Sequence, residues 1–335
     1  MDKRKQQLVE WLERDLKLKP DSLLPASADA SFRRYFRLTV GTDTYIVMDA
    51  PPQQEDVQPF IRIARRFREI GLNVPEILRQ DEDNGFLLLS DLGDQTYLNV
   101  LNEDSVDRLY GDALAALMML QAGTYREPEF LPAYSRQLLL DEMALFADWL
   151  LVKHLGIVLT EGQKRAIEGV YQVLVVNALE QPSVWVHRDF HSRNLMATSV
   201  RNPGILDFQD AVLGPVTYDL VSLLKDCYID WPREQVTSWV RDYHQLSRES
   251  GLQLTEDSQE FLRWFDLMGV QRHLKAAGIF ARLYHRDGKP GYLADIPRTL
   301  GYIMQLRSEY PELGPLTDLI ESLDTDLIVE HVAAT

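Results

Sequence analysis

The sequence predicts an α+β protein with two lobes: a small N-terminal lobe built on an antiparallel sheet with one main helix, and a larger, mainly helical C-terminal lobe. Three observations lead to this expectation. The chain has 335 residues, which suggests two domains at roughly 100–200 residues each. Short β-branched and aromatic runs fill much of the first 90 residues. Beyond residue 100 the apolar positions recur mostly at helical spacing.

Residues 1–90 contain the expected sheet. An amphipathic helix at 6–18 ends before Pro20, and runs at 32–40 and 44–48 flank a turn and predict a hairpin. A helix at 57–70 ends at Gly71. Two more strands are predicted at 74–79 and 85–89. The turn residues SDLGD at 90–94 then indicate a boundary, so we assign 91–97 to a connector and 98–335 to the second lobe.

The second lobe is predicted to be mostly helical. Amphipathic spacing predicts helices at 106–121, 135–155, 161–179, 218–227, 232–250 and 259–283. The exception is the stretch 183–208. There, residues 184–186 read as a buried strand leading into a polar loop, and residues 195–197 as a strand leading out of it.

Composition excludes several classes of protein. The 51 acidic residues exceed the 35 basic ones and give a net charge of −16, so we expect no nucleic-acid partner. Cys227 is the one cysteine, which excludes an intrachain disulfide and favours a reducing compartment. No apolar run is long enough to cross a membrane, and the N-terminus lacks the apolar core of a signal peptide. We therefore expect a cytoplasmic protein with no membrane and no obligate protein partner.

The strongest chemical signal is HRDFHSRN at residues 187–194, followed by ILDF at 205–208. Phosphoryl transfer requires a carboxylate that orients the attacking hydroxyl, and Asp189 has the position for that catalytic role. Mg²⁺ prefers hard oxygen ligands, which Asn194 and Asp207 would supply. His187 is expected to support the loop by packing and hydrogen bonding rather than to react.

These segments resemble the catalytic and metal-binding loops of the aminoglycoside phosphotransferase family, which shares the bilobal fold of protein kinases. The resemblance extends through GILDFQD at 204–210 and GPVTYDL at 214–220. It implies ATP and Mg²⁺ as cofactors, a nucleotide-binding first lobe and a catalytic second lobe. In that family the residue matching Asp219 buttresses the catalytic loop. An ordinary carboxylate at a helix N-terminus is the alternative for Asp219, and Asp210 either assists in the site or caps a turn.

The sequence departs from the kinase-like pattern at the strand lysine that normally contacts the α- and β-phosphates. No lysine occurs between Lys19 and Lys153, and Met48 stands at the end of the strand where the lysine is expected. Either an arginine supplies the missing charge, which its planar fork suits, or ATP binding is impaired. We favour the arginine.

The candidate phosphate loop is SADASFRR at 27–34. Arg33, Arg34 or Arg37 would replace the lysine charge, and Ser31 would add a hydroxyl or a backbone N–H. A solvated basic hairpin edge is the alternative. Asp91 follows the apolar strand at 86–89, so the backbone around Leu89 and Asp91 is expected to meet the adenine.

Further segments resemble the bacterial amino-sugar kinases of the same family: SADASFRRYFRL, YIVMDAPP, GFLLLSDLGDQTYL and MGVQRHLKAAGIFARL. In those kinases the strand lysine is missing as well. The resemblance spans nearly the whole chain. It implies phosphorylation of the anomeric hydroxyl of N-acetylmuramic acid and N-acetylglucosamine during peptidoglycan recycling.

Several polar residues are candidates for contacting the acceptor. Arg193, inside the loop, would contact the acceptor or the transferred phosphate. A second set offers hydroxyl acceptors, a flat apolar face or cations for a lactyl carboxylate: Asp226, Asp230, Trp231, Arg272, His273 and Lys275. The alternative is that these charges are solvated and that the tryptophan belongs to the core.

Two other functions stay open on the sequence alone. The acidic balance favours an antibiotic kinase whose polycationic aminoglycoside would bind clustered Asp and Glu side chains. A pseudokinase that binds nucleotide or acts as a scaffold is suggested by Met48. The complete set of Asp189, Asn194 and Asp207 argues against the pseudokinase.

Overall fold

The computed structural model describes residues 2–26, 32–124 and 129–330. They divide into two compact units. Unit 1 comprises residues 1–100 and 194–210, and unit 2 comprises residues 101–193 and 211–335. Residues 194–210 therefore pack with the first hundred residues, although they lie far along the chain.

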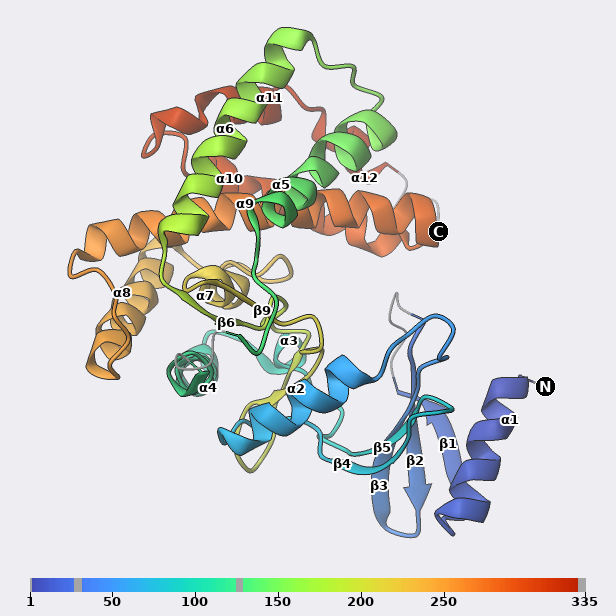
Figure 1. Cartoon of the computed structure of the whole chain (residues 1–335). Coiled ribbons are helices and arrows are strands. Elements are labelled where there is room, and N and C mark those ends of the chain that lie inside the picture. The colour runs from blue at the N-terminus through green and yellow to red at the C-terminus, as the bar shows by residue number, and fades with distance from the viewer. Residues whose placement is uncertain (1, 27–31, 125–128, 331–335) are drawn as a thin grey trace. The chain divides into compact units, whose positions relative to one another are not determined.

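Unit 1 is built on a five-stranded antiparallel sheet (Figure 1). Its strand order is β1-β2-β3-β5-β4. The strands and helices are α1 (Lys3–Glu10), the π-helical segment Trp11–Asp15, β1 (Ser22–Pro25), β2 (Arg34–Val40), β3 (Asp43–Asp49), α2 (Gln58–Glu69), β4 (Ile77–Asp81), β5 (Phe86–Ser90), α3 (Tyr97–Val100), β7 (Leu195–Met196) and β8 (Gly204–Ile205). The fold class predicted from the sequence is confirmed for this unit. Strand β1 was not predicted, because its four residues are too few to show a period.

The first helix covers one face of the sheet. Leu8, Trp11 and Leu12 are buried against Phe36 and Phe86 of the sheet, and Figure 1 shows α1 beside β1. Burial of each such side chain contributes about 1.5–3 kcal/mol to stability. The predicted helix at 6–18 therefore exists in part: it begins earlier, at Lys3, and its last turns are π-helical.

Helix α2 packs against the segment 194–210. Phe208 packs against the rings of Phe60 and Phe67, with centroids 4.8 and 5.6 Å away. The parallel bridge from Asn73 to Gly204 and the antiparallel bridge from Thr96 to Met196 add backbone contacts. These contacts hold β7 and β8 to unit 1.

Unit 2 is mainly helical, as predicted. Its elements are α4 (Val106–Thr124), α5 (Arg136–Leu145), the π-helical segment Phe146–His154, α6 (Glu161–Glu180), β6 (Ser183–Val186), β9 (Val212–Pro215), α7 (Tyr218–Leu224), α8 (Arg233–Glu249), α9 (Ser258–Asp287), α10 (Ile296–Met304), α11 (Gly314–Glu321) and α12 (Thr325–Val329), with short 3₁₀ turns at Pro290–Asp295 and Pro311–Leu313.

Helix α9 organises unit 2. It has 30 residues, and it packs against α5, α6, α7, α8 and α10 (Figure 1). A Cβ at Gly278 would lie 2.3 Å from the carbonyl carbon of Leu145, so only glycine allows this approach of α9 to α5. Because so many elements contact α9, side chains along it reach several parts of the unit.

Candidate active site

The polar loop at residues 187–193 begins at the end of β6. Strand β6 pairs antiparallel with β9, and its residues 184–186 are buried. Asp219 at the start of α7 accepts hydrogen bonds from the backbone N–H groups of His187 and Arg188, at 2.6 and 2.9 Å. Arg188 has φ +77°, a backbone conformation that non-glycine residues adopt only when their surroundings hold it. Asp219 therefore fixes the entrance to the loop.

A second carboxylate fixes the far end of the loop. Asp226 is buried, and it accepts the N–H of Ser192 at 2.9 Å and that of Tyr228 at 3.1 Å. His187 is fully buried, and its Nδ1 accepts the N–H of Asp189 at 3.3 Å. The loop that carries Asp189 is thus rigid before any ligand binds.

Asp189 lines a cavity of about 160 Å³ that lies wholly within unit 2. Other residues that line it include His191, Tyr228, Arg272, Lys275 and Phe280. Pockets for whole small molecules usually measure about 300–1,000 Å³, so this cavity accommodates part of an acceptor.

The charge of Asp189 is set by its neighbours. Burial acts to raise the pKa of its carboxyl group, but interactions with Lys275, His191 and Arg272 outweigh burial and lower the pKa to about 2. By contrast, burial raises the pKa of Asp219 to about 7, although its two N–H partners favour the ionised form. Asp189 is therefore an anion at neutral pH. A carboxylate with this pKa is a weak base, better suited to orienting a hydroxyl than to deprotonating it early.

Arg193 lies beside the same cavity. Its guanidinium carbon is 3.7 Å from the ring centroid of Tyr228 and 5.2 Å from that of Tyr292, and both tyrosines line the cavity. Cation–π contacts of this kind orient the arginine while leaving its N–H groups available.

The structure brings together two of the six predicted acceptor contacts. Arg272 and Lys275 both line the cavity. Lys275 donates to the hydroxyl of Tyr218 at 3.0 Å and lies 3.1 Å from Glu142. Arg272 is buried and its guanidinium donates to Sγ of Cys227 at 3.7 Å.

The other four predicted contacts do not line this cavity. Asp226 supports the loop, as described above. Asp230 is exposed and lies 3.7 Å from Arg298. Trp231 donates its indole N–H to the hydroxyl of Tyr110 at 3.0 Å. His273 is buried, stacks on Tyr302 and hydrogen-bonds to the carbonyl of Lys225, and burial lowers its pKa to about 3.

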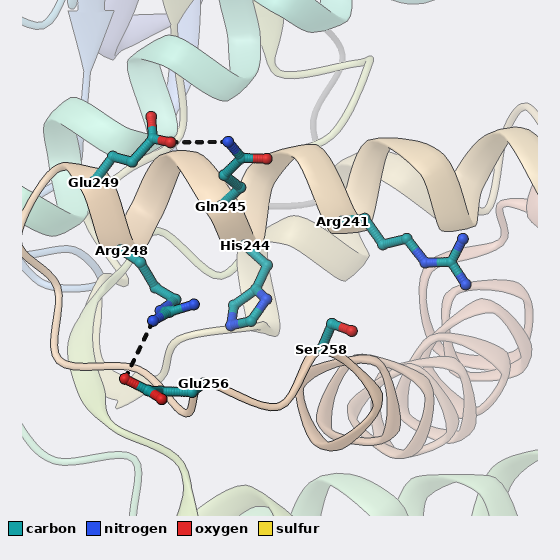
Figure 2. A pocket seen from close by; sticks show the side chains of 7 residues that line it. All are labelled: Arg241, His244, Gln245, Arg248, Glu249, Glu256 and Ser258. Carbon is teal, nitrogen blue, oxygen red and sulfur yellow. Dashed lines mark hydrogen bonds and ion pairs between the residues drawn. The ribbon is translucent and has the colours of Figure 1, made fainter.

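A larger hollow of about 650 Å³ is found elsewhere in unit 2 (Figure 2). It lies between the end of α8 and the start of α9, and shares no lining residue with the cavity at Asp189. Several of its polar groups partner one another: Gln245 donates to Glu249 at 2.8 Å, and Arg248 lies 3.4 Å from Glu256. The smaller cavity, with its buried charges and rigid loop, is the better candidate for chemistry.

In unit 1 the two predicted metal ligands lie side by side. Strands β7 and β8 pair with Leu195 opposite Ile205, which brings together residues on either side of the hairpin. The amide nitrogen of Asn194 is 3.5 Å from a carboxylate oxygen of Asp207, and Gln209 donates to the other oxygen at 2.7 Å. Asp207 is exposed and has φ +62°.

This pair of side chains fits a magnesium ion. Among the described residues, no three His, Cys, Asp or Glu side chains gather as a self-sufficient metal site. Mg²⁺ does not need one, because it commonly takes one or two protein oxygens and fills its other positions with phosphate oxygens and waters. Asn194 and Asp207 offer that number of oxygen ligands.

The arginines of the predicted phosphate loop have partners within unit 1. Arg33 lies 3.0 Å from Glu55. Arg34 binds the buried carboxylate of Asp49 and that of Asp2. Ser31 lies outside the described residues.

The other predicted nucleotide contacts lie near the end of β5. Leu89 is buried and pairs with Ile46 in β3. The carboxylate of Asp91 accepts from Nε of Arg37 at 2.7 Å and from the N–H of Gly93 at 2.9 Å. Met48 is fully buried in unit 1, which accounts for the apolar residue in place of a lysine.

Sequence reasoning missed several residues of the cavity. His191 and Tyr228 line it; His191 lies within the quoted loop motif and could have been included, whereas nothing in the sequence pointed to Tyr228. Glu142 binds both Arg188 and Lys275. It lies on an amphipathic helix with no local sign that its carboxylate is buried.

The described helices include none that is both long and apolar enough to cross a membrane.

The profile of the phosphotransferase enzyme family matches residues 22–260. The chain belongs to this family. The family resemblance predicted from the loop motifs is thereby confirmed.

Relatives match almost the full chain. It is 48% identical to an N-acetylmuramate/N-acetylglucosamine kinase from Pseudomonas aeruginosa, covering 96% of this chain and 97% of that one. A kinase of the same name from Pseudomonas putida is 46% identical, covering 96% and 97%. One from Neisseria meningitidis is 44% identical, covering 95% and 96%.

Solved structures confirm the kinase-like fold. The GDP complex of aminoglycoside 2′-phosphotransferase-IIIa aligns with a TM-score of 0.62 at 15% identity, covering 92% of this chain and 99% of that chain. A choline kinase from Streptococcus pneumoniae aligns with a TM-score of 0.62 at 10% identity, covering 89% and 98%. At such low identity the two likenesses concern the fold alone.

Proposed function

We propose that this phosphotransferase is an ATP-dependent kinase that phosphorylates the anomeric hydroxyl of N-acetylmuramic acid and N-acetylglucosamine. Three relatives at 44–48% identity over nearly the whole chain are named for these two sugars. The structural observation that carries the proposal is a rigid loop presenting an ionised Asp189 to a cavity with aromatic walls. Such a cavity provides apolar faces for a sugar ring and one carboxylate for its reacting hydroxyl.

In this mechanism Asp189 orients the acceptor hydroxyl and accepts its proton late. Phosphoryl transfer asks little covalent work of a protein beyond alignment and charge stabilisation, so a weak base suffices. An anomeric hydroxyl is more acidic than an ordinary sugar alcohol, which reduces the demand on the base further. Asp219 and Asp226 keep the loop in place, because each accepts backbone N–H groups of the loop.

Asn194 and Asp207 would hold Mg²⁺ in unit 1. When bound, the ion neutralises charge on the phosphates of ATP. Arg33 and Arg34, with Ser31, Leu89 and Asp91, are the proposed nucleotide contacts of this unit. Arg193 is the proposed contact to the acceptor or to the transferred phosphate.

The charge of the cavity disfavours an aminoglycoside acceptor. A polycation would need several carboxylates, but the cavity is lined by the carboxylate of Asp189 together with the cations Arg272 and Lys275. The nearby acidic candidates are used otherwise, since Asp226 binds backbone N–H groups and Asp230 lies outside the cavity. An acceptor that is neutral or anionic fits this lining better.

The proposal is tested by ATP consumption with four acceptors: N-acetylmuramic acid, N-acetylglucosamine, kanamycin and choline. We expect turnover of the first two only. The product should be a sugar 1-phosphate, which no longer reacts as a reducing sugar and releases phosphate in acid. Turnover of kanamycin or choline alone would replace the sugar by another acceptor. Nucleotide binding without turnover of any acceptor would support the scaffold instead.

The variant Asp189→Asn tests the role of the carboxylate. It should lower kcat for both sugars about 10²–10⁴-fold or more while preserving ATP binding and the unfolding midpoint. Asp242→Asn, at an exposed position on α8, is the matched control and should behave as the parent protein. Near-normal turnover by Asp189→Asn would contradict the mechanism.

A further inference from the structure

Arg272 is a buried cation with no carboxylate at ion-pair distance. It lies on α9 with 5% of its surface exposed. Among the described residues its hydrogen bond goes to Sγ of Cys227 at 3.7 Å, its Nε has no partner, and no carboxylate lies within 4.0 Å of it. A thiol is a weak acceptor. Burying a guanidinium without a carboxylate at contact distance is costly. The charge of Arg272 reaches Asp189 only from beyond that distance, so its N–H groups have no strong acceptor in the described part of the chain.

A second group in the same cavity is also unsatisfied. His191 is buried, and its Nδ1 has no hydrogen-bond partner among the described residues. Burial lowers the pKa of its imidazole, which favours the neutral ring, in which one nitrogen carries a proton. The cavity is therefore lined by a guanidinium that no carboxylate pairs and by an imidazole whose Nδ1 has no partner in the described part of the chain. Both are suited to an anionic group.

Lys275 supports the assignment to Arg272 rather than to itself. It lies one turn further along α9, where its ammonium group already meets Glu142 and Tyr218. Glu142 also binds Arg188. The charge of Lys275 is therefore matched within the fold, and the unmatched cation of this wall is Arg272.

The two proposed substrates differ by one anionic group. N-acetylmuramic acid carries a lactyl ether that ends in a carboxylate, and N-acetylglucosamine has a hydroxyl at that position. We propose that Arg272 binds the lactyl carboxylate in a two-pronged ion pair, assisted by His191, and so determines the preference between the two sugars. This inference rests on the proposed function. Arginine is the side chain whose planar fork matches a carboxylate with two parallel hydrogen bonds.

Asp189 and Arg272 would contact different parts of the sugar. Asp189 handles the hydroxyl that both sugars share, whereas Arg272 handles the group found only in N-acetylmuramic acid. The same guanidinium also acts on Asp189 through its charge, and that effect is equal for both sugars. Selectivity, rather than the rate alone, is thus the diagnostic quantity.

The test uses kcat/KM for three acceptors: N-acetylmuramic acid, its lactyl methyl ester, which is neutral, and N-acetylglucosamine. In the parent protein the acid should exceed the ester by about tenfold or more, as expected for a charge-assisted pair. In Arg272→Gln that ratio should approach one, mainly through a higher KM for the acid, and N-acetylglucosamine should lose activity by a smaller factor. Arg272→Lys should recover part of the preference.

Arg282→Gln is the matched control, because Arg282 lies on the same helix but does not line the cavity. It should preserve the ratio of acid to ester. An equal loss for all three acceptors in Arg272→Gln would assign Arg272 to Asp189 or to the transferred phosphate and overturn the inference. A ratio near one in the parent protein would also overturn it, even if the variants failed to fold. Failure of the parent protein to phosphorylate either sugar would instead contradict the proposed function.

Discussion

Two buried charges on α9, six residues apart, are treated in opposite ways. Asp266 is fully buried and accepts hydrogen bonds from Lys225 at 2.8 Å, from both terminal nitrogens of Arg233 at 2.6 and 2.5 Å, and from the hydroxyl of Tyr310 at 2.9 Å. Arg272 is also buried, but its one hydrogen-bond partner among the described residues is a thiol.

The contrast between these regions separates two uses of a buried charge. Around Asp266 every strong acceptor site is filled by the protein, so the cluster holds α9 to α7 and α8 and leaves nothing for a ligand. Arg272 lines a cavity, and among the described residues no carboxylate pairs with it, so on our proposal the anion comes from a ligand. A saturated cluster indicates a structural role, and an unsaturated one indicates a binding site.

The largest expected effect concerns stability. Asp266→Ala leaves the buried ammonium of Lys225 without its carboxylate, so we expect a loss of about 3–5 kcal/mol in the free energy of unfolding. Arg272→Met should be close to neutral, because it removes a buried guanidinium that no carboxylate pairs and loses only its longer-range attraction to Asp189. Urea unfolding of both variants measures the difference. Equal losses of stability in the two variants would break the comparison.

Much of the fold, and the close approach of Asn194 to Asp207, could be predicted from the sequence. The helical periods beyond residue 100 and the loop motif at 187–194 are local patterns. Such patterns can be recognised in a single sequence, because they involve residues close together in the chain. The clustering of Asn194 with Asp207 follows from a short hairpin whose strands are only two residues each. That hairpin was predicted in part, from the strand at 195–197.

The predicted acceptor contacts were harder to place, for a physical reason. Arg272, His273 and Lys275 are neighbours in sequence, yet a helix directs Arg272 and Lys275 to one side and His273 to another, where it stacks on Tyr302. Asp226 resembled a surface carboxylate but is buried against backbone N–H groups. Partners so distant along the chain leave no periodic trace in the sequence.

A smaller effect concerns the pH dependence of turnover. Lys275 is the foremost of the positive charges that hold the pKa of Asp189 at about 2 despite its burial. Lys275→Met should therefore raise this pKa towards or above its ordinary value. In the proposed mechanism the carboxylate is the active form, so kcat/KM for N-acetylglucosamine should begin to fall at a higher pH on the acid side than in the parent protein. A profile from pH 4 to 8 measures this shift.

The control for that profile is Lys164→Met, which removes an exposed lysine that pairs with Glu161 on α6. It should leave the acid side of the profile unchanged. If Lys275→Met lowers kcat/KM equally at every pH, Lys275 contributes by its packing and not by its charge. That outcome would give Lys275 a structural role, as the charges around Asp266 have, and would leave the contrast with Arg272 and His191 unchanged.

The smallest expected effect could break the comparison altogether. Arg33 and Arg34 have carboxylate partners, Glu55 for the first and Asp49 for the second, and by the rule above they should be structural. The sequence nonetheless predicts that they replace the missing lysine at the phosphates of ATP. On that prediction Arg33→Ala or Arg34→Ala raises the KM for ATP several-fold, equivalent to about 1 kcal/mol, with KM for the sugar unaffected.

Arg66→Ala is the control, since Arg66 pairs with Glu69 on α2. Unchanged KM values for ATP in both loop variants would exclude the arginines as phosphate ligands. A raised value in either would mean that a paired arginine can exchange its carboxylate for a phosphate, so saturation would no longer distinguish a structural charge from a binding one.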